Sequence, residues 1–534
     1  MHDVVIIGSG HNGLVCSAYL AMGGLKVLVL DQRPVAGGAA VTEEFSPGFR
    51  NSVASYAVSL LNPKIIRDLD LAVHGLRIVE RPVSNFLPLG AGSFLKVGGS
   101  HTKREVAKFS ARDAERLDDY QRRLAAVANV LRACALETPP NIVEGSPFAV
   151  LLKAGTIANR IRALGLDLQR DFLDLFAASA GDFLDGWFES APIKAAFGFD
   201  SVVGNYASPY TPGSAYVLLH HSFGEVNGKK GVWGHAIGGM GAITQAMAKA
   251  AAARGVTIRL STRVRQVLVE NGRAIGVETD KGETVCAATV AAGINPKLLY
   301  LHLVEARALP EGFRRRMENW RCGSGTFRMN VALSELPDFT ALPGRALAEH
   351  HASGIIIAPS LAYMEQAYFD ARSFGWSRRP IIELVIPSTI DDTLAPRGQH
   401  VASLFCQHVA PKLPDGSSWD DHRETVADLM IETVDDHAPN FRRSVLARQI
   451  FSPLDLERTF GLIGGDIFHG ALDLRQIFSA RPMLGHADYR GPIAGLYLCG
   501  SGGHPGGGVT GAPGHNAARE ILRDFKCKRI ARAR

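Results

Sequence analysis

A glycine-rich turn near the start of the chain constrains its fold more than any other segment. The turn has the G-x-G-x-x-G spacing and comprises Gly8, Ser9, Gly10, His11, Asn12 and Gly13. Residues 3–7 before it have the apolar composition of a buried parallel strand, and residues 14–22 after it continue as an apolar helix. Gly8 permits the tight turn, Gly10 lets a pyrophosphate approach the backbone, and Gly13 lets helix and strand pack closely. The order of strand, turn and helix therefore predicts a dinucleotide site, with the phosphates at the helix N-terminus.

A carboxylate follows the second strand of this unit. Residues 26–30 predict that strand, which ends at Asp31, and the side chain there can accept hydrogen bonds from an adenosine ribose. A 2′-phosphate would be repelled by the same carboxylate. An ordinary glycine turn is the competing interpretation, but it explains neither the two flanking strands nor the acid. We therefore expect Asp31 to bind the ribose of a dinucleotide.

The segment after the acid resembles a known flavoprotein fingerprint. It carries Arg33, Gly37, Gly38, Ala39, Thr42 and Gly48. The run D-Q-R-P-V-A-G-G from Asp31 to Gly38 is similar to the extended fingerprint of the FAD-dependent amine oxidase and phytoene desaturase superfamily, which usually has Glu in place of Asp31. The shorter acid is still expected to reach the ribose. The resemblance implies FAD as the cofactor, with Arg33 and residues 37–39 beside it.

A second block, residues 231–295, resembles another part of the same FAD domain. Residues 238–241 (G-G-M-G) precede a predicted helix over 242–253. Strands are predicted over 256–260, 264–270, 274–279 and 288–292. The resemblance implies that the main chain of Val264 contacts adenine. Because no second G-x-G-x-x-G follows a strand, a separate NAD(P) domain is not expected.

A third glycine-rich segment, near the end of the chain, is predicted to close the domain. Residues 496–516 have the pattern of a strand, a glycine-rich turn and a helix start. Backbone amides and a helix N-terminus there suit the electron-rich pyrimidine side of a flavin. Pro505 and Pro513 stiffen the segment, which disfavours a flexible linker. The contacts that the resemblance implies fall at Gly500, Val509, Thr510 and Gly511.

The resemblance extends over nearly the whole chain. The motifs that carry it are G-H-N-G-L-V at 10–15, G-G-A-A-V-T-E-E at 37–44, L-L-H-H at 218–221, G-G-M-G at 238–241 and L-Y-L-C-G-S-G at 496–502. On these motifs the chain resembles the pyridine nucleotide-disulphide oxidoreductase domain-containing protein 2 family. That family lies in the phytoene desaturase-like (carotenoid desaturase/ketolase) branch of FAD-dependent amine oxidase-type flavoproteins.

The resemblance implies an α/β fold with two discontinuous domains. A Rossmann-like FAD-binding domain of the amine oxidase (GR2) type is expected from residues 1–75, 231–295 and 481–534. An α+β substrate domain, or cap, is expected from residues 76–230 and 296–480.

The substrate domain offers a pocket wall and an apolar helical region. Residues 381–386 and 401–407 are strand-like and suit a sheet beside the flavin. Residues 148–188 are predicted to be helical, with a stripe of apolar side chains. Core packing is the default interpretation of that stripe, and a membrane-touching entrance for a lipid-like substrate is the alternative.

The seven cysteines are scattered along the chain without a C-x-x-C pair. This pattern is typical of a reducing compartment. It provides no local cysteine pair for exchange with a flavin, although the family's name promises disulfide chemistry. We therefore expect flavin chemistry without a redox-active disulfide.

Candidate catalytic residues follow from where the flavin is expected. Catalysis needs a substrate carbon near the flavin and a base for any departing proton. His504 is the first candidate because the C-terminal turn should lie at the isoalloxazine. Trp233, His235 and Tyr206 are the further candidates. For each of them, holding the turn or lining the pocket is the structural alternative.

Metals and nucleic acids are not expected as ligands. Histidine pairs occur at 220–221 and 350–351, but neighbouring side chains of a strand point to opposite faces, and no H-E-x-x-H motif supports a site. The formal charge is +6, and residues 519–534 hold seven basic and two acidic residues. That tail is expected to be solvated, with contact to anionic lipid as the alternative, and no nucleic acid-binding motif accompanies it.

Three functions remain open. The favoured one is an FAD-dependent dehydrogenase or desaturase of a small apolar, isoprenoid- or lipid-like substrate, with electrons passed to oxygen or a quinone. A redox-neutral isomerase or a ketolase of the carotenoid type is the second, and a flavin-stabilised interaction protein without catalysis is the third. We expect a cytoplasmic protein. It would be peripheral to a membrane if the apolar helical stripe or the basic tail contacts lipid, and mitochondrial if the source is eukaryotic. The sequence does not predict the oligomeric state.

Overall fold

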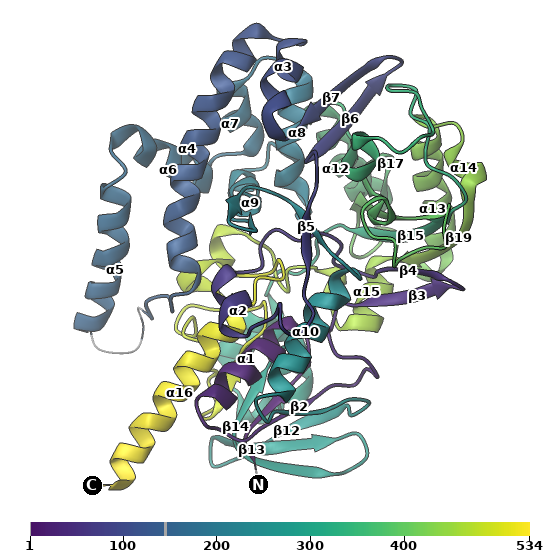
Figure 1. Ribbon diagram of the computed structural model, residues 1–534. Helices are drawn as coiled ribbons and strands as arrows, with labels where there is room; N and C mark the ends of the chain where they lie inside the picture. Colours follow the sequence, from purple (N-terminus) through teal and green to yellow (C-terminus); the bar gives the residue numbers. More distant parts are fainter. Residues whose placement is uncertain (1, 142, 144–146, 534) are drawn as a thin grey trace.

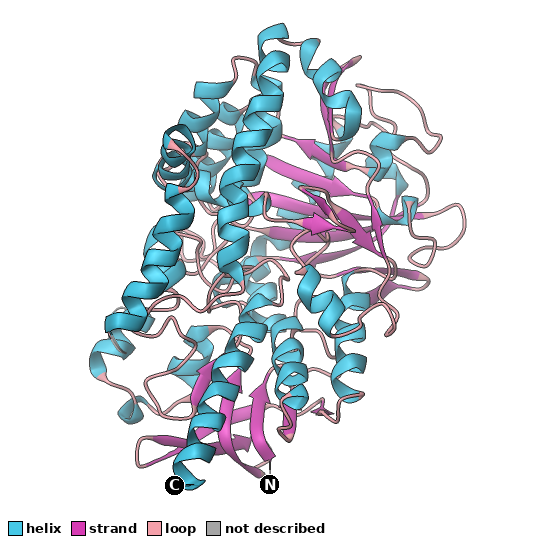
Figure 2. Cartoon of the chain, turned by 60° about the vertical axis from the view of Figure 1, so that its left-hand side comes forward, coloured by secondary structure: helices cyan, strands magenta, loops and turns pink. Residues whose placement is uncertain are grey.

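The computed structural model describes residues 2–141, 143 and 147–533. Two seven-stranded sheets organise it, and both chain ends lie beside the first sheet (Figure 1). The second sheet lies at the opposite end of the molecule and is flanked by helices (Figure 2). Among the described helices, none combines the length and the hydropathy needed to cross a membrane.

The first sheet is assembled from three separate parts of the sequence. Its strands are β1 (His2–Ile7), β2 (Val27–Leu30), β11 (Thr257–Arg259), β12 (Val264–Glu270), β13 (Arg273–Thr279), β14 (Thr284–Ala292) and β20 (Leu496–Leu498). β1 pairs in parallel with β2 and β14, and β14 also pairs in parallel with β20, whereas β12, β13 and β14 form an antiparallel meander. β1 is therefore a central strand, and its apolar run is buried on both faces.

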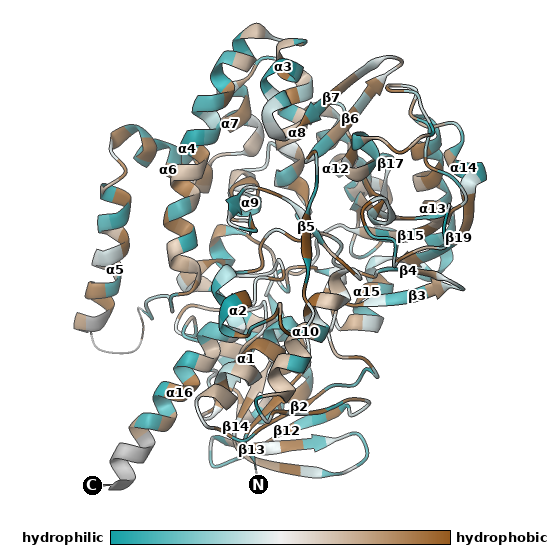
Figure 3. Cartoon of the chain, viewed as in Figure 1, coloured by the Kyte–Doolittle hydropathy of each residue, from teal (hydrophilic) through white to brown (hydrophobic). Residues whose placement is uncertain are grey.

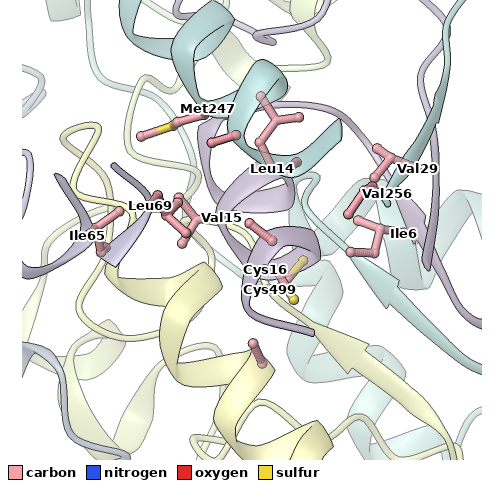
Figure 4. Close-up of a cluster of buried hydrophobic side chains, with 14 of the residues drawn as sticks. Ile6, Leu14, Val15, Cys16, Val29, Ile65, Leu69, Met247, Val256 and Cys499 are labelled. Carbon is pink, nitrogen blue, oxygen red and sulfur yellow. The ribbon is translucent and has the colours of Figure 1, made fainter. Parts of the chain in front are cut away.

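Helices cover one face of this sheet. They are α1 (His11–Met22), α10 (Met240–Ala252) and α16 (Ala512–Ala533). Their apolar side chains form one cluster with the strands, in which Leu14, Val15, Met247 and Cys499 take part (Figure 4). A Cβ atom at Gly13 would lie 2.1 Å from the carbonyl oxygen of Gly8, so only glycine allows α1 to pack this closely.

The opposite face is covered by the meander and by a segment that follows β14. That segment contains the π-helical turn η2 (Leu298–Leu303) and α11 (Glu311–Glu318). Leu299, Phe313 and Met317 pack there against Val5 and Leu28 of the central strands. Residues 298–318, expected with the substrate domain, thus pack on the first sheet.

The second sheet has the strand order β19-β15-β18-β17-β16-β6-β7. These strands are β6 (Asn85–Gly90), β7 (Ser93–Val97), β15 (Phe327–Leu333), β16 (Gly354–Ile357), β17 (Trp376–Val385), β18 (His400–Val409) and β19 (Val445–Phe451). One face packs against α13 (Trp419–Asp435) through residues such as Phe327 and Met430. The other face meets a layer of helices through residues such as Ile381 and Phe405.

That helical layer contains most of residues 102–221 together with α12. Its members are α3 (Thr102–Ala107), α4 (Ala111–Ala135), α5 (Pro147–Arg162), α6 (Leu166–Ala177), α7 (Ala180–Trp187), α8 (Ala191–Val202), α9 (Ser214–His221) and α12 (Leu361–Phe374). Figure 1 shows α5 at the outer edge, away from the second sheet. The remaining described α-helices and strands are α2 (Pro63–Asp68), α14 (Phe441–Ser444), α15 (Pro453–Phe460) and the short strands β3 (Thr42–Ser46), β4 (Phe49–Ser52), β5 (Ile78–Glu80), β8 (Glu225–Val226), β9 (Lys229–Lys230) and β10 (Gly234–Ala236).

The α/β fold predicted from the sequence is confirmed. The predicted strand over 264–270 coincides with β12, and the helical prediction over 148–188 corresponds to α5, α6 and α7. The strand geometry assumed for the histidine pairs is wrong, because residues 220–221 end α9 and residues 350–351 lie in the 3-10 helix η4 (Glu349–Ala352). Ala215, Leu218 and Leu219 share one buried face of α9. Their i, i+3, i+4 spacing is typical of a helix, whereas a strand would have apolar residues at alternate positions.

Candidate functional site

An elongated cavity runs from the glycine turn of the first sheet to the second sheet. Its first end is lined by Gly8, Gly10, Asp31, Arg33 and Val264, beside β1, β2 and β12. Its far end is lined by Tyr56, Val203, His221, Trp233, Phe405 and Phe468. Because Phe405 belongs to β18 and Val203 follows α8, the cavity connects the two halves of the fold.

Asp31 organises the first end of the cavity. Its Oδ2 atom accepts hydrogen bonds from the amide and the hydroxyl of Ser9, both at 2.7 Å, and its Oδ1 atom accepts one from the amide of Arg33 at 2.9 Å. The carboxylate is thus fixed between the end of β2 and the glycine turn. Ser9 itself does not line the cavity. Its contribution to the site is to hold the carboxylate of Asp31 in place.

The glycine turn leaves space and unpaired polar groups for an anionic ligand. A Cβ atom on Gly38 would lie 3.1 Å from the Cα atom of Gly10, so the two glycine backbones meet at the cavity wall. Gly10 caps α1 without a side-chain hydrogen bond, which leaves the amides of the first turn available. The Nε2 atom of His11 and the Oδ1 atom of Asn12 are buried without a partner in the described structure, and both residues line the cavity. These features fit the pyrophosphate of FAD.

Arg33, Ala39 and Val264 also line this part of the cavity. The guanidinium of Arg33 donates to the carbonyl of Gly38 at 3.1 Å and forms an ion pair with Glu43. Gly13 and Gly37 are predicted cofactor residues that do not line the cavity. Gly13 supports the packing of α1, and the amide of Gly37 donates to the carbonyl of Ser9 at 3.0 Å.

The C-terminal loop forms the wall between the two ends. Ser501, Gly508 and Val509 line the cavity, and the Nδ2 atom of Asn12 donates to the hydroxyl of Ser501 at 2.9 Å. Gly500, Thr510 and Gly511 lie behind that wall. The carbonyl of Thr510 accepts a bond from the amide of Asn62, and Cβ atoms on Gly500 or Gly511 would meet Gly293 or Ile65 at 2.8 Å. Of the four residues predicted in this loop, only Val509 therefore faces the cavity.

Arg481 ties this loop to the segment that carries Phe468. Its side chain is completely buried and donates to the carbonyls of Ser501 and Phe468, both at 2.8 Å, and to that of Gln476 at 3.0 Å. Burial lowers the pKa of Arg481 to about 10, so the guanidinium stays protonated at neutral pH. No sequence pattern indicates this residue, because an arginine in a loop is exposed in most proteins.

The far end of the cavity is apolar and aromatic. Val203, Phe405 and Phe468 are apolar, and the hydroxyl of Tyr56 donates to Glu383 behind the wall. Arg328 is buried behind Tyr56, with its guanidinium 4.5 Å from the centre of the tyrosine ring. The charged residues among those that line the described cavity, Asp31, Arg33 and Arg263, lie at its first end.

His221 is the imidazole at this far end. Its Nδ1 atom lies 2.9 Å from the carbonyl oxygen of Val217 and must be the donor of that hydrogen bond. The Nε2 atom of the neutral ring therefore carries the lone pair. Burial lowers the pKa of His221, although hydrogen bonding to the backbone carbonyls of Val217 and Asp200 acts to raise it. The ring stacks on Trp233 with centroids 6.2 Å apart.

Of the catalytic candidates predicted from sequence, Trp233 alone lines this cavity. The ring of His504 turns toward α4, where its Nε2 atom lies 3.1 Å from the carbonyl oxygen of Cys134. The Nε2 atom of His235 forms a hydrogen bond of 2.8 Å with the Oδ2 atom of Asp391, and the ring of Tyr206 packs against that of Tyr368. The candidate that the sequence interpretation missed is His221, in the L-L-H-H motif, because its histidines were considered only as metal ligands.

Two cysteines far apart in the sequence meet behind the cavity. Cys16 of α1 and Cys499, directly after β20, lie side by side in the apolar cluster of the first sheet (Figure 4). Local spacing could not reveal this pair, and the sequence-based expectation, which concerned only a local pair such as C-x-x-C, is unaffected. A hydrogen bond with Cys499, together with burial, raises the pKa of Cys16 well above its usual value. The pair is held as thiols rather than reactive thiolates.

Comparison with known proteins gives two matching families and several similar proteins. The NAD(P)-binding Rossmann-like domain family matches residues 6–69, and the family of flavin containing amine oxidoreductases matches residues 76–327. Pyridine nucleotide-disulfide oxidoreductase domain-containing protein 2 of Rattus norvegicus is 41% identical over 98% of this chain and 94% of its own length. The lycopene-forming phytoene desaturase of Pseudescherichia vulneris is 24% identical over 96% of each chain. The crystal structure of an oxidoreductase from Methanosarcina mazei superposes with a TM-score of 0.60 at 16% identity, over 97% of this chain and 99% of that one.

Proposed function

Since the chain belongs to the family of pyridine nucleotide-disulfide oxidoreductase domain-containing protein 2 and matches the flavin containing amine oxidoreductases over residues 76–327, we propose that it is a dehydrogenase or desaturase of an apolar substrate. It is an oxidoreductase with FAD as its cofactor. The substrate, the electron acceptor and the roles of individual residues are parts of the proposal.

The observation that carries the proposal is the apolar far end of the cavity. Tyr56, Phe405 and Phe468 offer flat apolar surface, and the carboxylate nearest to Tyr56, that of Glu383, accepts the tyrosine hydroxyl behind the wall. A charged substrate would lose its hydration there without gaining an ion pair. The lycopene-forming phytoene desaturase acts on phytoene, and its similarity to this chain agrees with an apolar, isoprenoid-like substrate.

We assign His221 as the base. Its Nδ1–H group is held by the carbonyl of Val217, so its Nε2 atom can accept the proton that leaves the substrate carbon. Bound FAD would supply the oxidant: the second hydrogen would leave the substrate as hydride, with both electrons, and oxygen or a quinone would reoxidise the cofactor. Trp233, stacked on His221, would keep the imidazole in place and exclude water from this end of the cavity.

Anaerobic reduction of the flavin tests the proposal. The purified protein is mixed without oxygen with a panel of apolar isoprenoids and of amines, and bleaching of the flavin absorption is followed. We expect an apolar compound to bleach it, and product with two hydrogens fewer; unchanged mass would indicate an isomerase, and added oxygen a ketolase. Reduction by amines alone would contradict the apolar assignment.

Two matched variants test the base. His221→Gln is expected to slow flavin reduction about 10²- to 10⁴-fold, the range typical of a lost general base, with FAD still bound. His504→Gln is the control, because that histidine is buried like His221 but faces Cys134. Equal effects of both substitutions would remove His221 from the proposed role. Reoxidation of the reduced protein by oxygen or by a soluble quinone then identifies the class of electron acceptor.

A further inference from the structure

Two aromatic rings at the far end of the cavity contact the same buried cation. Tyr56 and Phe405 both line that end, and their ring centroids lie 5.4 Å apart. The guanidinium carbon of Arg328 lies 4.5 Å from the centre of the tyrosine ring and 5.9 Å from the centre of the phenylalanine ring. Arg328 is fully buried and does not line the cavity. The two rings therefore stand between its positive charge and a ligand in the cavity.

The hydrogen-bond partners of Arg328 are neutral. Its Nη1 atom donates to the carbonyl of Leu404 at 2.8 Å, and its Nη2 atom donates to the hydroxyl of Ser403 at 2.6 Å. Its Nε atom is buried and has no partner among the described residues. Burial lowers the pKa of Arg328, but the ordinary value for arginine is so far above neutral pH that the guanidinium keeps its charge. No hydrogen-bond partner therefore cancels this charge.

The neighbouring carboxyl groups leave an excess of one positive charge. Glu383 accepts the hydroxyl of Tyr56, and its Oε1 atom lies 3.7 Å from the Nη1 atom of Arg81, so its charge is shared with a second arginine. Arg81 directly follows β5, whose hydrophobic residues lie near the centre of the view in Figure 3. Burial, together with the charge of Glu383, raises the pKa of Asp200 to about 8, so this carboxyl group is mostly protonated at pH 7. Two arginines thus face one carboxylate behind the far end of the cavity.

We propose that Arg328 is a specificity-determining residue, through which the far end of the cavity selects against ammonium groups and accepts neutral or anionic molecules. A cation that enters this end would lose its hydration and would meet a like charge on the other side of one ring. Repulsion is strong there, because the surroundings are apolar. A neutral hydrocarbon meets no such repulsion. The inference rests on the proposed function, because it takes the far end as the substrate site.

Three probes of similar shape measure this selectivity. Benzoate, benzylamine and benzyl alcohol are anionic, cationic and neutral at pH 7. Their binding to the oxidised, FAD-loaded protein is followed by the change in the flavin absorption spectrum, which requires no turnover. Both ions lose hydration on binding, so the ratio of their affinities reports the sign of the charge behind the rings. We expect wild type to bind benzoate at least about tenfold more tightly than benzylamine.

Substitutions of Arg328 and Glu383 are expected to act in opposite directions. Arg328→Met removes the cation, so the ratio of the benzoate affinity to the benzylamine affinity should fall at least about tenfold, whereas Arg328→Lys keeps the charge and should keep the preference. Glu383→Gln removes the opposing carboxylate and should raise the ratio. Arg379→Met is the matched control, because that arginine lies 5.2 Å from the centre of the Tyr363 ring but at an exposed position of β17.

The affinity for benzyl alcohol shows whether each variant keeps the shape of the cavity, and the flavin absorption shows whether it is folded. Equal affinities of the two ions in wild type, or the same ratio in Arg328→Met and Arg379→Met, would overturn the inference. If Arg328→Met loses its flavin, an unchanged ratio in Glu383→Gln overturns it instead. None of these results concerns reduction of the flavin by apolar compounds, so the proposed function would stand. Conversely, a panel that leaves the flavin oxidised would contradict the proposed function, while the probe affinities would still be measured.

Discussion

The backbone carbonyl of Ser501 accepts two hydrogen bonds from the guanidinium of Arg481, at 2.8 Å from Nη2 and at 3.2 Å from Nε. Through them a loop that lines the cofactor cavity is fixed to the segment 468–476, whose carbonyls accept the remaining donors. The shape of the cavity at its centre thus depends on Arg481, although the side chain of Arg481 does not line the cavity.

Replacement of this arginine is expected to be costly. Arg481→Leu would leave several buried carbonyls without donors, and we expect the free energy of unfolding to fall by about 3–5 kcal/mol. Arg475→Leu is the control, since that side chain is 69% exposed and paired with Asp473, and its effect is expected within about 0.5 kcal/mol. Urea unfolding followed by circular dichroism measures both. Similar values for the two variants would show that the buried contacts contribute little.

Asp31 is expected to govern cofactor affinity rather than chemistry. Asp31→Ala removes the acceptor for the ribose and for Ser9, so we expect FAD to bind about tenfold or more weakly, as the loss of a charged hydrogen-bond acceptor implies. Asp31→Glu is expected to retain most of the affinity, because the longer acid still reaches the ribose. Fluorescence titration of the apoprotein with FAD gives both constants, and tight binding by the alanine variant would contradict the assignment.

The rate of flavin reduction is expected to depend on pH through His221. The base must be neutral to accept a proton, and its pKa is lowered by burial. Reduction is therefore expected to be constant above the ordinary histidine pKa of about 6.5 and to decline only at lower pH, as the lowered pKa is approached. Stopped-flow rates across pH measure the profile, and His221→Gln should abolish this limb. A limb that persists in the variant belongs to another group.

Asp391 is expected to stabilise the fold in a pH-dependent way. Burial acts to raise the pKa of Asp391, but hydrogen bonds from His235, Thr393 and the amide of Gly238 outweigh it and lower the value to about 2. Because this lies below the ordinary value of 3.8, the stabilisation is complete above that pH and is lost as pH falls toward about 2.

The matching experiment compares two neighbouring aspartates. Asp391→Asn is expected to lower the free energy of unfolding at pH 7 by about 1–3 kcal/mol, and the difference from wild type should shrink in acid. Asp392→Asn, at an exposed position, is the control and should follow wild type at every pH. A pH-independent deficit in Asp391→Asn would show that packing, rather than the charged hydrogen bonds, accounts for its effect.

Thiol reactivity is expected to follow burial. Cys286 and Cys527 are exposed and should react quickly with an aromatic disulfide reagent, whereas Cys16 and Cys499 should react only after unfolding. Counting thiols before and after denaturation without reductant measures this. Two thiols fewer than the seven of the sequence would instead show one disulfide, and peptide mapping would then test whether it joins Cys16 to Cys499.

The parts of the site that lie on one continuous motif could be predicted from the sequence. The turn at 8–13 and Asp31 are local, because their geometry follows from glycine at fixed spacing after a strand. The far end of the cavity could not be predicted, since Tyr56, His221 and Phe405 come from unrelated elements and share no pattern. Tertiary contacts also decided the orientation of His504, whose backbone lies in the expected loop while its ring turns away.

The buried polar contacts could not be predicted from the sequence either. Arg481 and Asp391 carry no motif, and only the folded chain shows that each satisfies several backbone groups at once. Helical periodicity predicted the region 148–188 correctly, yet it could not tell that the side chains of Leu151 and Leu175 would differ, one exposed and one fully buried.

The pairing of β14 with both β1 and β20 has a consequence for biosynthesis. A ribosome synthesises β1 and α1 long before β20 and α16, which complete the same sheet and cluster. The nucleotide-binding half therefore cannot close before residues 496–521 have been made. A nonsense codon anywhere before residue 496 would leave the upstream strands and helices made but the cofactor site open.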